Sequence, residues 1–554
     1  MSTVSRLVSR ARKFRSVLPV CSAVLASAPG CAGGGAGDSG QGGTYGAGAD
    51  DDGGQARKTP ASGDGATASE SSSACPADFG CATDASAGPD ANGGTDASGS
   101  TNIDSGAAAS AAADGRSAAG ANGVANAGCV GSACAIPIKH VIVIVKENHT
   151  FDNYFGAFPG VEGTLTAGGQ NVCRSSKGPG PCARAPDAPS HDMCHGHDCG
   201  IIDWDQGKMD GWNHTGGSDT GDDLVYAQYG EESIPNYWAY ARHFALGDHY
   251  FADVLGPSLP GHMFTVAAQA GWATDNPPTD LPAKLVPGPP PMFLGPHPYW
   301  GCDEWPGDTV PILAGGVTPT KVFPCFNIPS IPDVLPTGVD WKYYGTNFDG
   351  LFSDTWSPFD AIQSIRKTPS KWAHVVNATQ LTADINNHTL PGVSWLVDQD
   401  QYSEHPDVTV PGLKLPLGGV CVGENWTLSY VNQLMASDYW KDTAILFTMD
   451  DFGGWYDHVP PPRQYGGTAS APYGLGFRLP LLIISPYAKP GFVFKEVSET
   501  ASIARFIERV FGASMTLHDL DPAAQDGQAN DLFGAFDFSQ QPLLPLPLKA
   551  RSCP

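Results

Sequence analysis

Positive charge is scarce in this sequence. Its 554 residues include 31 lysines and arginines against 57 aspartates and glutamates, a formal net charge of −26 at pH 7. Beyond the N-terminal segment no cluster of basic residues occurs. A nucleic-acid duplex would repel such a chain, so we expect no nucleic-acid partner. Much of the acidity lies in a low-complexity segment, where it would be solvated, and it therefore says little about the substrate.

Long apolar runs are missing from the N-terminal part of the chain. Residues 17–28 form a short apolar stretch after a basic start, too short for an ordinary membrane span, so residues 1–31 are predicted to be a secretory signal. Ala28-Pro29-Gly30-Cys31 resembles a bacterial lipobox, in which Cys31 would carry a lipid anchor to the membrane. Simple signal cleavage near Ala28 is the alternative. The protein is thus expected to be exported, as a cell-envelope lipoprotein or a secreted protein.

Large apolar residues are nearly absent from residues 32–128, which consist mainly of Gly, Ala, Ser and Asp. Such a segment cannot bury enough surface to offset the entropy of ordering, so it is predicted to be a disordered tether. Cys75 and Cys81 within it are expected to close a small loop. Residues 129–554 are enough for one large α/β catalytic domain.

The cysteine count fits an oxidising compartment. The chain has 14 cysteines; setting aside Cys21 in the signal and Cys31 at the lipobox leaves 12, an even number. The exported start favours disulfides over zinc sites. The close pairs are Cys129 with Cys134, Cys173 with Cys182, and Cys194 with Cys199.

Two adjacent carboxylates follow a predicted buried strand at residues 444–447. Asp450 and Asp451 would project from the carboxyl end of that strand, where α/β enzymes bind ligands, and the glycines at 453 and 454 allow a sharp turn. A divalent cation would relieve the repulsion between the two aspartates. Taken alone, the motif could also be a solvated turn.

A second predicted strand, residues 141–145, is followed at once by Glu147 and Asn148. Carboxylate and amide oxygens are hard ligands that suit a divalent metal and would complement the two aspartates. Their alternative role is to cap a helix that starts near Thr150.

Ser258 stands between Gly256-Pro257 and Leu259-Pro260. A serine on such a rigid turn suits a nucleophile whose hydroxyl is activated by a metal or a base. The alternative is an ordinary helix cap.

These three segments, in this order, resemble three sequence blocks of the bacterial phosphoesterase family that contains non-haemolytic phospholipases C and acid phosphatases. The likeness runs from about residue 136 to 538. The resemblance implies membership of the alkaline phosphatase superfamily and its fold: an α/β three-layer sandwich with a central, mostly parallel sheet and loop or cap insertions. The proline-rich residues 277–332, with Cys302 and Cys325, are expected to be an irregular insertion that walls the active site.

The resemblance also assigns site residues. Ser258 would be the nucleophile, and a divalent metal would lie among Glu147, Asn148, Asp450, Asp451 and the Ser258 oxygen. The expected active-site histidines are His195, His405 and His458. For the first of these, His197 is an alternative, and the segment that also holds His191 could instead form a separate metal site or a solvated loop. The oxygen-rich ligand set admits calcium, magnesium, manganese or iron.

Two positions depart from the family pattern. His149 stands where the first block usually has arginine, and Gly261-His262 stands where the second usually has Asn-Arg. Both changes remove a fixed guanidinium, so this protein must compensate or bind a different ester.

The expected function is therefore metal-dependent hydrolysis of a phosphate ester by the phospholipase C type of reaction, with phospholipids among the expected substrates. Alternatives are a broad-specificity acid phosphatase and a catalytically silent surface-binding lipoprotein on the same fold. The sequence block expected of sulfatases is not apparent.

Overall fold

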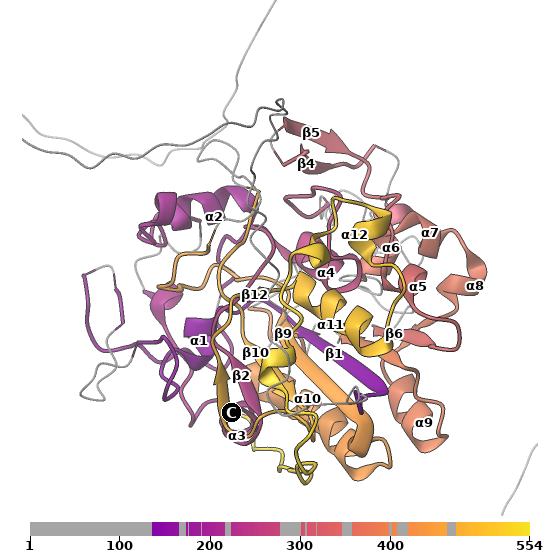
Figure 1. Ribbon diagram of the computed structural model, residues 1–554. Helices are drawn as coiled ribbons and strands as arrows, with labels where there is room; N and C mark the ends of the chain where they lie inside the picture. The colour runs from indigo at the N-terminus through magenta and orange to yellow at the C-terminus, as the bar shows by residue number, and fades with distance from the viewer. Residues whose placement is uncertain are drawn as a thin grey trace, which may run out of the picture. The chain divides into compact units, whose positions relative to one another are not determined.

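A mostly parallel eight-stranded sheet forms the centre of the protein (Figure 1), in the order β11-β2-β10-β9-β1-β8-β6-β7. Only β10 runs antiparallel to its neighbours. The strands are β1 His140–Lys146, β2 Ala245–Gly247, β6 Trp341–Gly345, β7 Val375–Asn377, β8 Val393–Val397, β9 Thr443–Met449, β10 Leu481–Ile484 and β11 Phe492–Phe494.

This computed structural model describes residues 136–164, 173–175, 177–189, 191–216, 223–277, 301–304, 307–316, 318–345, 357–397, 402–406, 419–462 and 473–554. The predicted signal, lipobox and tether lie outside the described residues. Among the helices of the described part, none combines the length and the apolar character needed to cross a membrane.

The strands form where apolar, β-branched runs occur, because strands of a parallel sheet are buried on both faces. Every residue of β9 is buried, and so is all of β1 after its first residue. The predicted strands at 141–145, 444–447 and 481–484 are thereby confirmed.

Helices cover both faces of the sheet. Trp395 of β8 donates a hydrogen bond to the carbonyl of Thr265 on α4, whereas the ring of Phe447 in β9 contacts Tyr237 on α3. Trp395 lies in register with Val143 of β1 and, through it, with Leu446 of β9. Since neighbouring residues of a strand point to opposite faces, Phe447 and Trp395 lie on different faces. The three-layer α/β architecture predicted from the sequence is therefore confirmed.

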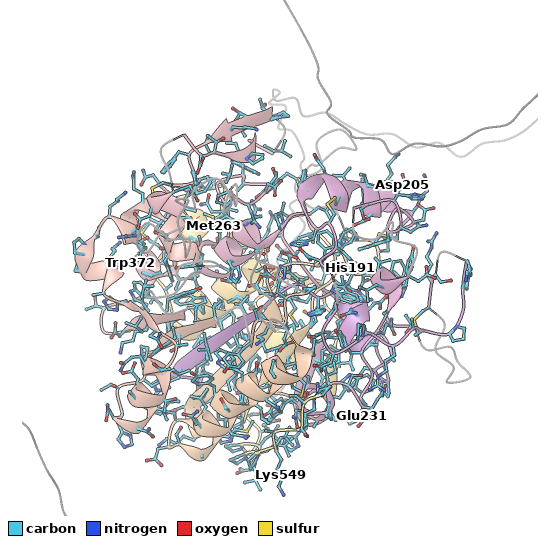
Figure 2. All side chains as sticks on the ribbon, turned by 180° about the vertical axis from the view of Figure 1, so that it is seen from behind. His191, Asp205, Glu231, Met263, Trp372 and Lys549 are labelled. Carbon is cyan, nitrogen blue, oxygen red and sulfur yellow. A yellow bond between two sulfur atoms is a disulfide. The ribbon has the colours of Figure 1, made fainter. Side chains whose placement is uncertain are left out.

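The longer helices are α2 His197–Trp204, α3 Pro235–His243, α4 Ser258–Ala267, α9 Gln380–Asn386, α10 Val420–Ala436 and α11 Ala501–Phe511. Short helices are α1 Phe151–Phe155, α5 Ile331–Val334, α6 Pro358–Ala361, α7 Gln363–Arg366, α8 Pro369–Trp372 and α12 Leu517–Leu520. Seen from behind, side chains fill the space between the sheet and its helices (Figure 2). The helix predicted to start near Thr150 is α1, with Thr150 as its N-cap.

The segment expected to be an irregular insertion contains regular structure. Its described part includes an antiparallel hairpin of β4 Val310–Ala314 and β5 Thr318–Val322. The expectation of an irregular segment was wrong here, because proline is tolerated in a two-stranded hairpin, where each strand has a free edge. Pro311 and Pro319 both lie within its strands.

Disulfides tie several loops to the fold. The predicted pairs Cys173–Cys182 and Cys194–Cys199 are confirmed. Two more bonds join Cys302 to Cys325 and Cys421 to Cys553. The expected pairs Cys129–Cys134 and Cys75–Cys81 lie outside the described residues.

Candidate active site

The ends of β1 and β9 bring the predicted carboxylates together. In the parallel register Lys146 lies opposite Met449, so Glu147 and Asp450 leave the sheet side by side. The chain turns at once after β1: Asn148 has a left-handed φ of 65°, and its N–H donates to Asp450 Oδ1 at 3.1 Å. A side chain at Gly453 would meet the Asn148 carbonyl oxygen at 2.3 Å, so this close approach requires glycine.

Ser258 completes this group from a third segment. It is the first residue of α4, and Pro257 occupies the N-cap position, so Ser258 is not the helix cap that was its alternative role. Its Oγ lies 3.3 Å from Glu147 Oε2 and 3.2 Å from Asp451 Oδ2, and the residue is 2% exposed. The helix approaches this closely because Gly261 packs on Asp450, where a Cβ would be 2.2 Å from the carbonyl oxygen.

The amide of Asn148 lies between the carboxylates and two histidines. One of its two end atoms is 3.3 Å from Glu147 Oε2 and 3.1 Å from Asp450 Oδ1. The other is 2.9 Å from His405 Nε2 and 3.2 Å from His195 Nε2. Both histidines are half-buried. They therefore lie between the buried carboxylates and solvent.

Backbone contacts fix the ring orientations of these histidines. His195 Nδ1 is 2.7 Å from the Met193 carbonyl, and His405 Nδ1 is 2.5 Å from that of Pro406. Each Nδ1 donates to its carbonyl. The Asn148 amide is satisfied at both ends when its nitrogen donates to Glu147 and Asp450 and its oxygen accepts from the two Nε2 atoms. The Ser258 hydroxyl then has one proton for two carboxylates, Glu147 and Asp451, and a cation among them would remove the remaining repulsion.

Electrostatics support the same conclusion. Burial, and then the charge of Asp450, raise the pKa of Asp451 well above its ordinary value. Burial alone would lower the pKa of His195, but the charges of Asp192 and Asp451 outweigh it and raise the pKa to about 9. Among the described residues, neither Asp450 nor Asp451 forms an ion pair with a lysine or arginine. The donor set of Glu147, Asn148, Ser258, Asp450 and Asp451 thus fits a divalent cation in kind and charge.

His262 occupies one of the positions where the family usually has arginine. It is fully buried, with Nε2 2.7 Å from Glu147 Oε1 and 3.7 Å from Asp450 Oδ2. Burial lowers its pKa to about 4, so the ring is neutral at pH 7 and donates to Glu147. A neutral hydrogen-bond donor here replaces the expected permanent charge and orients the outer oxygen of Glu147.

His149, at the other such position, faces away from this group. Its Nε2 is 3.0 Å from the Glu404 carbonyl and its Nδ1 is 2.8 Å from Asn153 Oδ1. The ring packs between Tyr154 and Trp455, and burial lowers its pKa to about 4. It holds the backbone next to His405.

His458 lies in a different cluster. Its Nδ1 donates to Asp152 Oδ2 at 2.6 Å, and the side chain is 31% exposed. Asp152 also binds the buried Arg478 at 3.0 Å. Within the described parts of the chain, His458 makes no hydrogen bond or ion pair with the group around Ser258.

The two candidates His195 and His197 contact different parts of the protein. His195 reaches Asn148, whereas His197 begins α2 and its Nδ1 contacts the Leu255 carbonyl. Of the two candidates, His195 is the one in the Ser258 group.

Sequence reasoning missed several residues that support the site. Glu404 is fully buried with an ion pair to Lys146 at 3.4 Å. Arg478 is buried with no motif around it that marks its role. The only available signal for Glu404 was its place next to the predicted His405.

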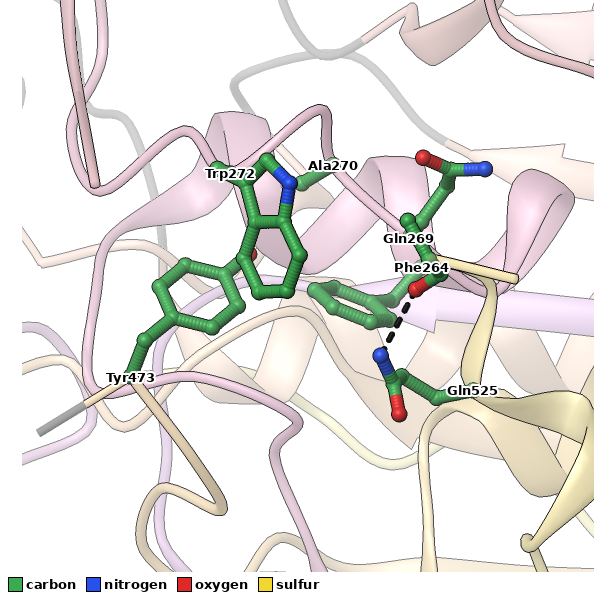
Figure 3. A pocket seen from close by; sticks show the side chains of 7 residues that line it. Phe264, Gln269, Ala270, Trp272, Tyr473 and Gln525 are labelled. Carbon is green, nitrogen blue, oxygen red and sulfur yellow. Dashed lines mark hydrogen bonds between the residues drawn. The ribbon is translucent and has the colours of Figure 1, made fainter. Parts of the chain in front are cut away.

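A small cavity elsewhere on α4 is not part of this group. It lies near the helix's C-terminal end and is lined by Phe264, Trp272, Tyr473 and two glutamines, among others (Figure 3). Its lining has no charged side chain or histidine. It therefore lacks a cationic side chain that would offset the charge of a phosphate.

Comparison with known proteins identifies the family. The sequence model of the Phosphoesterase family matches residues 138–514. The chain belongs to the Phosphoesterase family.

Proteins that are similar to this chain in sequence include phospholipases C. The non-hemolytic phospholipase C of Pseudomonas aeruginosa is 27% identical over 462 residues, which cover 74% of this chain and 58% of that protein. Phospholipase C A of Mycobacterium tuberculosis is 24% identical over 458 residues, 73% of this chain and 78% of that protein. The chain thus spans less than two thirds of the Pseudomonas relative. A solved structure of a protein in the alkaline phosphatase superfamily from Vibrio parahaemolyticus has a TM-score of 0.30 and 9% identity, covering 68% of this chain and 67% of that one.

Proposed function

We propose that this phosphoesterase is an exported, metal-dependent phosphoric ester hydrolase of the phospholipase C type, with Ser258 as its nucleophile. The observation that carries the proposal is the meeting of Ser258 Oγ with Glu147 and Asp451 at 3.3 and 3.2 Å, in a buried group where no lysine or arginine pairs with either Asp450 or Asp451 in the described parts of the chain. Membership of the family and relatives named phospholipase C support it.

Glu147, Asn148, Asp450, Asp451 and the Ser258 oxygen would hold the cation. When bound, it would lower the pKa of the Ser258 hydroxyl and offset negative charge on the substrate. The protein supplies the geometry: two strand ends and one helix start fix the ligands, and His262 fixes the outer oxygen of Glu147.

Ser258 Oγ attacks phosphorus in line while the bond from phosphorus to the leaving alcohol breaks. The hydroxyl proton has a neighbouring carboxylate to receive it. Water then attacks the phosphoserine, restores the Ser258 hydroxyl and releases the phosphate product. Two proton transfers are thus needed outside the metal group.

His195 and His405 are proposed to serve these transfers. Both lie on the solvent side of the carboxylates and have their Nε2 atoms directed toward Asn148. One would protonate the leaving alkoxide and then, as a neutral ring, accept the proton of the attacking water, and the other would donate a hydrogen bond to a phosphoryl oxygen. His458, oriented by Asp152 and partly exposed, is proposed as a further active-site histidine that meets the substrate away from phosphorus.

The substrate class within this chemistry is a phosphodiester, including phospholipids. A lipid anchor at Cys31 would hold the enzyme near such a substrate. A phosphomonoesterase and a non-catalytic binding lipoprotein are the competing functions.

Hydrolysis assays separate these three. The purified protein is offered a chromogenic phosphocholine diester and a chromogenic phosphomonoester with a panel of divalent metals and with a chelator. We expect diester turnover, lost at least 10³-fold in Ser258→Ala. The matched control is Ser429→Ala, an exposed serine on α10 whose hydroxyl donates to the Trp426 carbonyl of the same helix. Monoester turnover alone would favour the phosphatase, and no Ser258-dependent turnover would favour the binding protein.

A further inference from the structure

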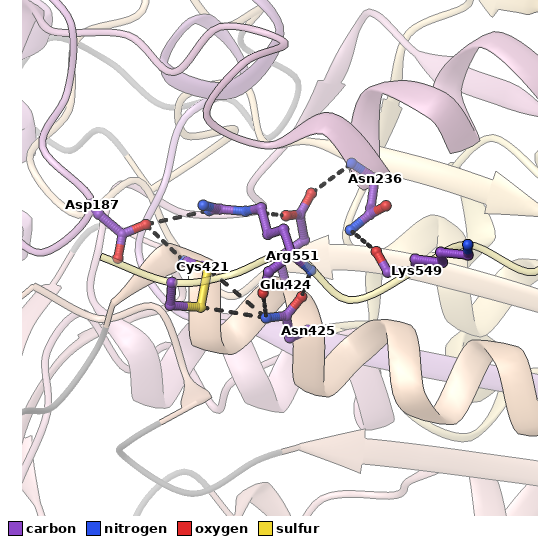
Figure 4. The surroundings of a disulfide bond; sticks show 8 residues. Asp187, Asn236, Cys421, Glu424, Asn425, Lys549 and Arg551 are labelled. Carbon is purple, nitrogen blue, oxygen red and sulfur yellow. Dashed lines mark hydrogen bonds and ion pairs between the residues drawn. A yellow bond between two sulfur atoms is a disulfide. The ribbon is translucent and has the colours of Figure 1, made fainter.

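The C-terminal strap, residues 548–553, is fastened along one face of α10 (Figure 4). Asn432 and Leu548 exchange two hydrogen bonds, at 2.9 and 3.1 Å, and Asn425 and Arg551 exchange two more, at 2.8 and 2.9 Å. Seven helical residues rise about 10 Å, which three extended residues also span. The spacing of the two asparagines therefore matches that of their partners.

Two stronger links close the strap. Cys553 forms a disulfide with Cys421 in the first turn of α10. Arg551 Nε donates to Glu424 Oε2 at 2.8 Å, and its Nη2 lies 3.3 Å from Asp187 Oδ1. The Glu424 side chain is fully buried, so Arg551 is its counter-charge.

Glu424 connects the strap to α3. Its other oxygen, Oε1, accepts from the backbone N–H groups of Asn236 at 2.8 Å and Tyr237 at 3.1 Å. These are in the first turn of α3, where N–H groups have no partner within the helix and the helix dipole favours a negative charge. The position of Glu424 thus fixes the start of α3.

Tyr237 carries the connection to a second buried carboxylate. Its hydroxyl donates to Glu404 Oε1 at 2.7 Å. The same Oε1 lies 3.4 Å from Lys146 Nζ, and Tyr154 donates to the other oxygen. The two ends of Tyr237 therefore bind two buried glutamates, one held by the strap and one beside the candidate active site.

Glu404 in turn fixes the backbone of His405. Its φ of 74° is left-handed, a conformation that a non-glycine residue holds only when its surroundings impose it. The Glu404 carbonyl accepts from His149 at 3.0 Å, and the N–H of Glu147 donates to the Ser403 carbonyl at 2.9 Å. His405 Nε2, one residue on, lies 2.9 Å from the Asn148 amide.

We propose that the C-terminal strap positions His405 for catalysis through Glu424, Tyr237 and Glu404. The strap and these three residues are positioning elements, because none of them is in the Ser258 group. The inference rests on the proposed hydrolase function. It makes full activity depend on the Cys421–Cys553 bond, although that bond lies outside the metal-binding group. Because the metal ligands stay in place when the link is cut, kcat falls while KM changes little.

A pair of tyrosines on α3 tests the link. Tyr237→Phe removes the hydroxyl that binds Glu404 and also lies 3.1 Å from Thr427 Oγ1. We expect kcat to fall roughly tenfold with KM within twofold. Tyr240→Phe removes an equally buried hydroxyl that has no hydrogen-bond partner among the described residues. It should leave kcat unchanged. Thermal unfolding of both variants confirms that each is folded at the assay temperature.

Variants of the strap test the end of this link that is farthest from His405. Arg551→Met and the double change Cys421→Ser with Cys553→Ser should each lower kcat several-fold, and neither should lower it further in the Tyr237→Phe background. Lys549→Met is the control: Lys549 lies at the periphery in the same strap (Figure 2), and its exposed ammonium has no ion-pair partner in the described part of the chain. If Arg551→Met does not fold, the disulfide variant tests the role of the strap in its place.

An NMR readout separates this proposal from the function on which it rests. In protein labelled with ¹⁵N-histidine, the His405 imidazole signals are assigned by their loss in His405→Asn. They should shift in Tyr237→Phe and in both strap variants, but not in Tyr240→Phe or Lys549→Met. Absence of wild-type turnover would overturn the hydrolase function and leave this shift as the test of positioning. Unchanged His405 signals and kcat in Tyr237→Phe or in both strap variants would overturn the positioning role.

Discussion

Two carboxylate clusters in this fold solve the same electrostatic problem differently. Around Ser258, the buried Asp450 and Asp451 form no ion pair with a lysine or arginine among the described residues; the neutral His262 lies 3.7 Å from Asp450, and the half-buried His195 acts on Asp451 through its charge. In the second cluster the fully buried Arg478 lies 3.0 Å from Asp152, 3.2 Å from Asp248 and 2.9 Å from Asp457.

Asp451 and Asp457 are close in sequence, so the contrast arises from tertiary partners and not from local composition. Buried carboxylates that are paired with a guanidinium need no bound cation to balance their charge. Those that lack one are stable as anions only when a cation joins them. The difference favours a structural role for the Arg478 cluster and is compatible with the proposed metal-binding role of the Ser258 cluster.

Removing the Arg478 guanidinium is expected to change the stability of the protein the most. Arg478→Met removes the buried guanidinium that these three carboxylates share, so we expect the free energy of unfolding to fall by about 3–5 kcal/mol. Chemical denaturation monitored by circular dichroism measures this. Arg509→Met is the control, because its ion pair with Asp531 is half-exposed and should contribute less than ~1 kcal/mol. Equal losses in the two variants would contradict the structural role of Arg478.

Added divalent cation should stabilise the protein through the Ser258 cluster alone. A divalent ion at 100 times its Kd is expected to stabilise the folded protein by about 2.7 kcal/mol, and a chelator should reverse this. Asp450→Asn removes a ligand and should abolish most of the rise in Tm. Asp457→Asn, a change of the same kind in the compensated cluster, should lower the starting Tm but keep the rise. A cation effect that persists in Asp450→Asn and is lost in Asp457→Asn would place the metal in the wrong cluster.

The sequence was informative where local pattern controls structure. The apolar runs of β1 and β9 predicted buried strands, and the residues just beyond them were predicted to complement one another as metal ligands. They meet because these strands are parallel and end at a common edge. Ser258 was predicted as a partner only through the resemblance to a family. The site itself remains a prediction until its activity and metal binding are measured.

Long-range partners could not be predicted. Arg478 binds carboxylates more than 200 residues upstream, and Cys421 pairs with Cys553 across 132 residues. Beyond its place next to His405, nothing local marks Glu404. Its importance comes from Lys146, Tyr154 and Tyr237, which converge on its side chain. His262 shows the same limit, because the sequence indicated only that a fixed guanidinium is missing at this position, whereas burial is what keeps the histidine neutral.

A third group of buried acidic residues extends the comparison, and its expected effect on stability is smaller. Glu508 of α11 and Asp526 are buried, and Glu508 Oε2 and Asp526 Oδ1 have no hydrogen-bond partner among the described residues. The nearest guanidinium, that of Arg505, is 3.8 Å from Glu508. Burial and then Asp526 raise the pKa of Glu508 to about 8. The pair therefore lowers its charge by holding a proton.

This proton makes stability depend on pH. Above pH 4.5 the unfolded chain releases the Glu508 proton, while the folded protein keeps it up to about pH 8. The unfolded state thus binds fewer protons, and stability falls as pH rises across that window. Glu508→Gln removes this slope, so its Tm should exceed that of the wild type by roughly 2 °C at pH 8 and match it near pH 4.5. Glu496→Gln, an exposed glutamate bound to Asn530, should show no such trend. If Tm of Glu508→Gln and wild type ran parallel between these pH values, the folded protein would not hold the proton and the pair would belong with the uncompensated cluster.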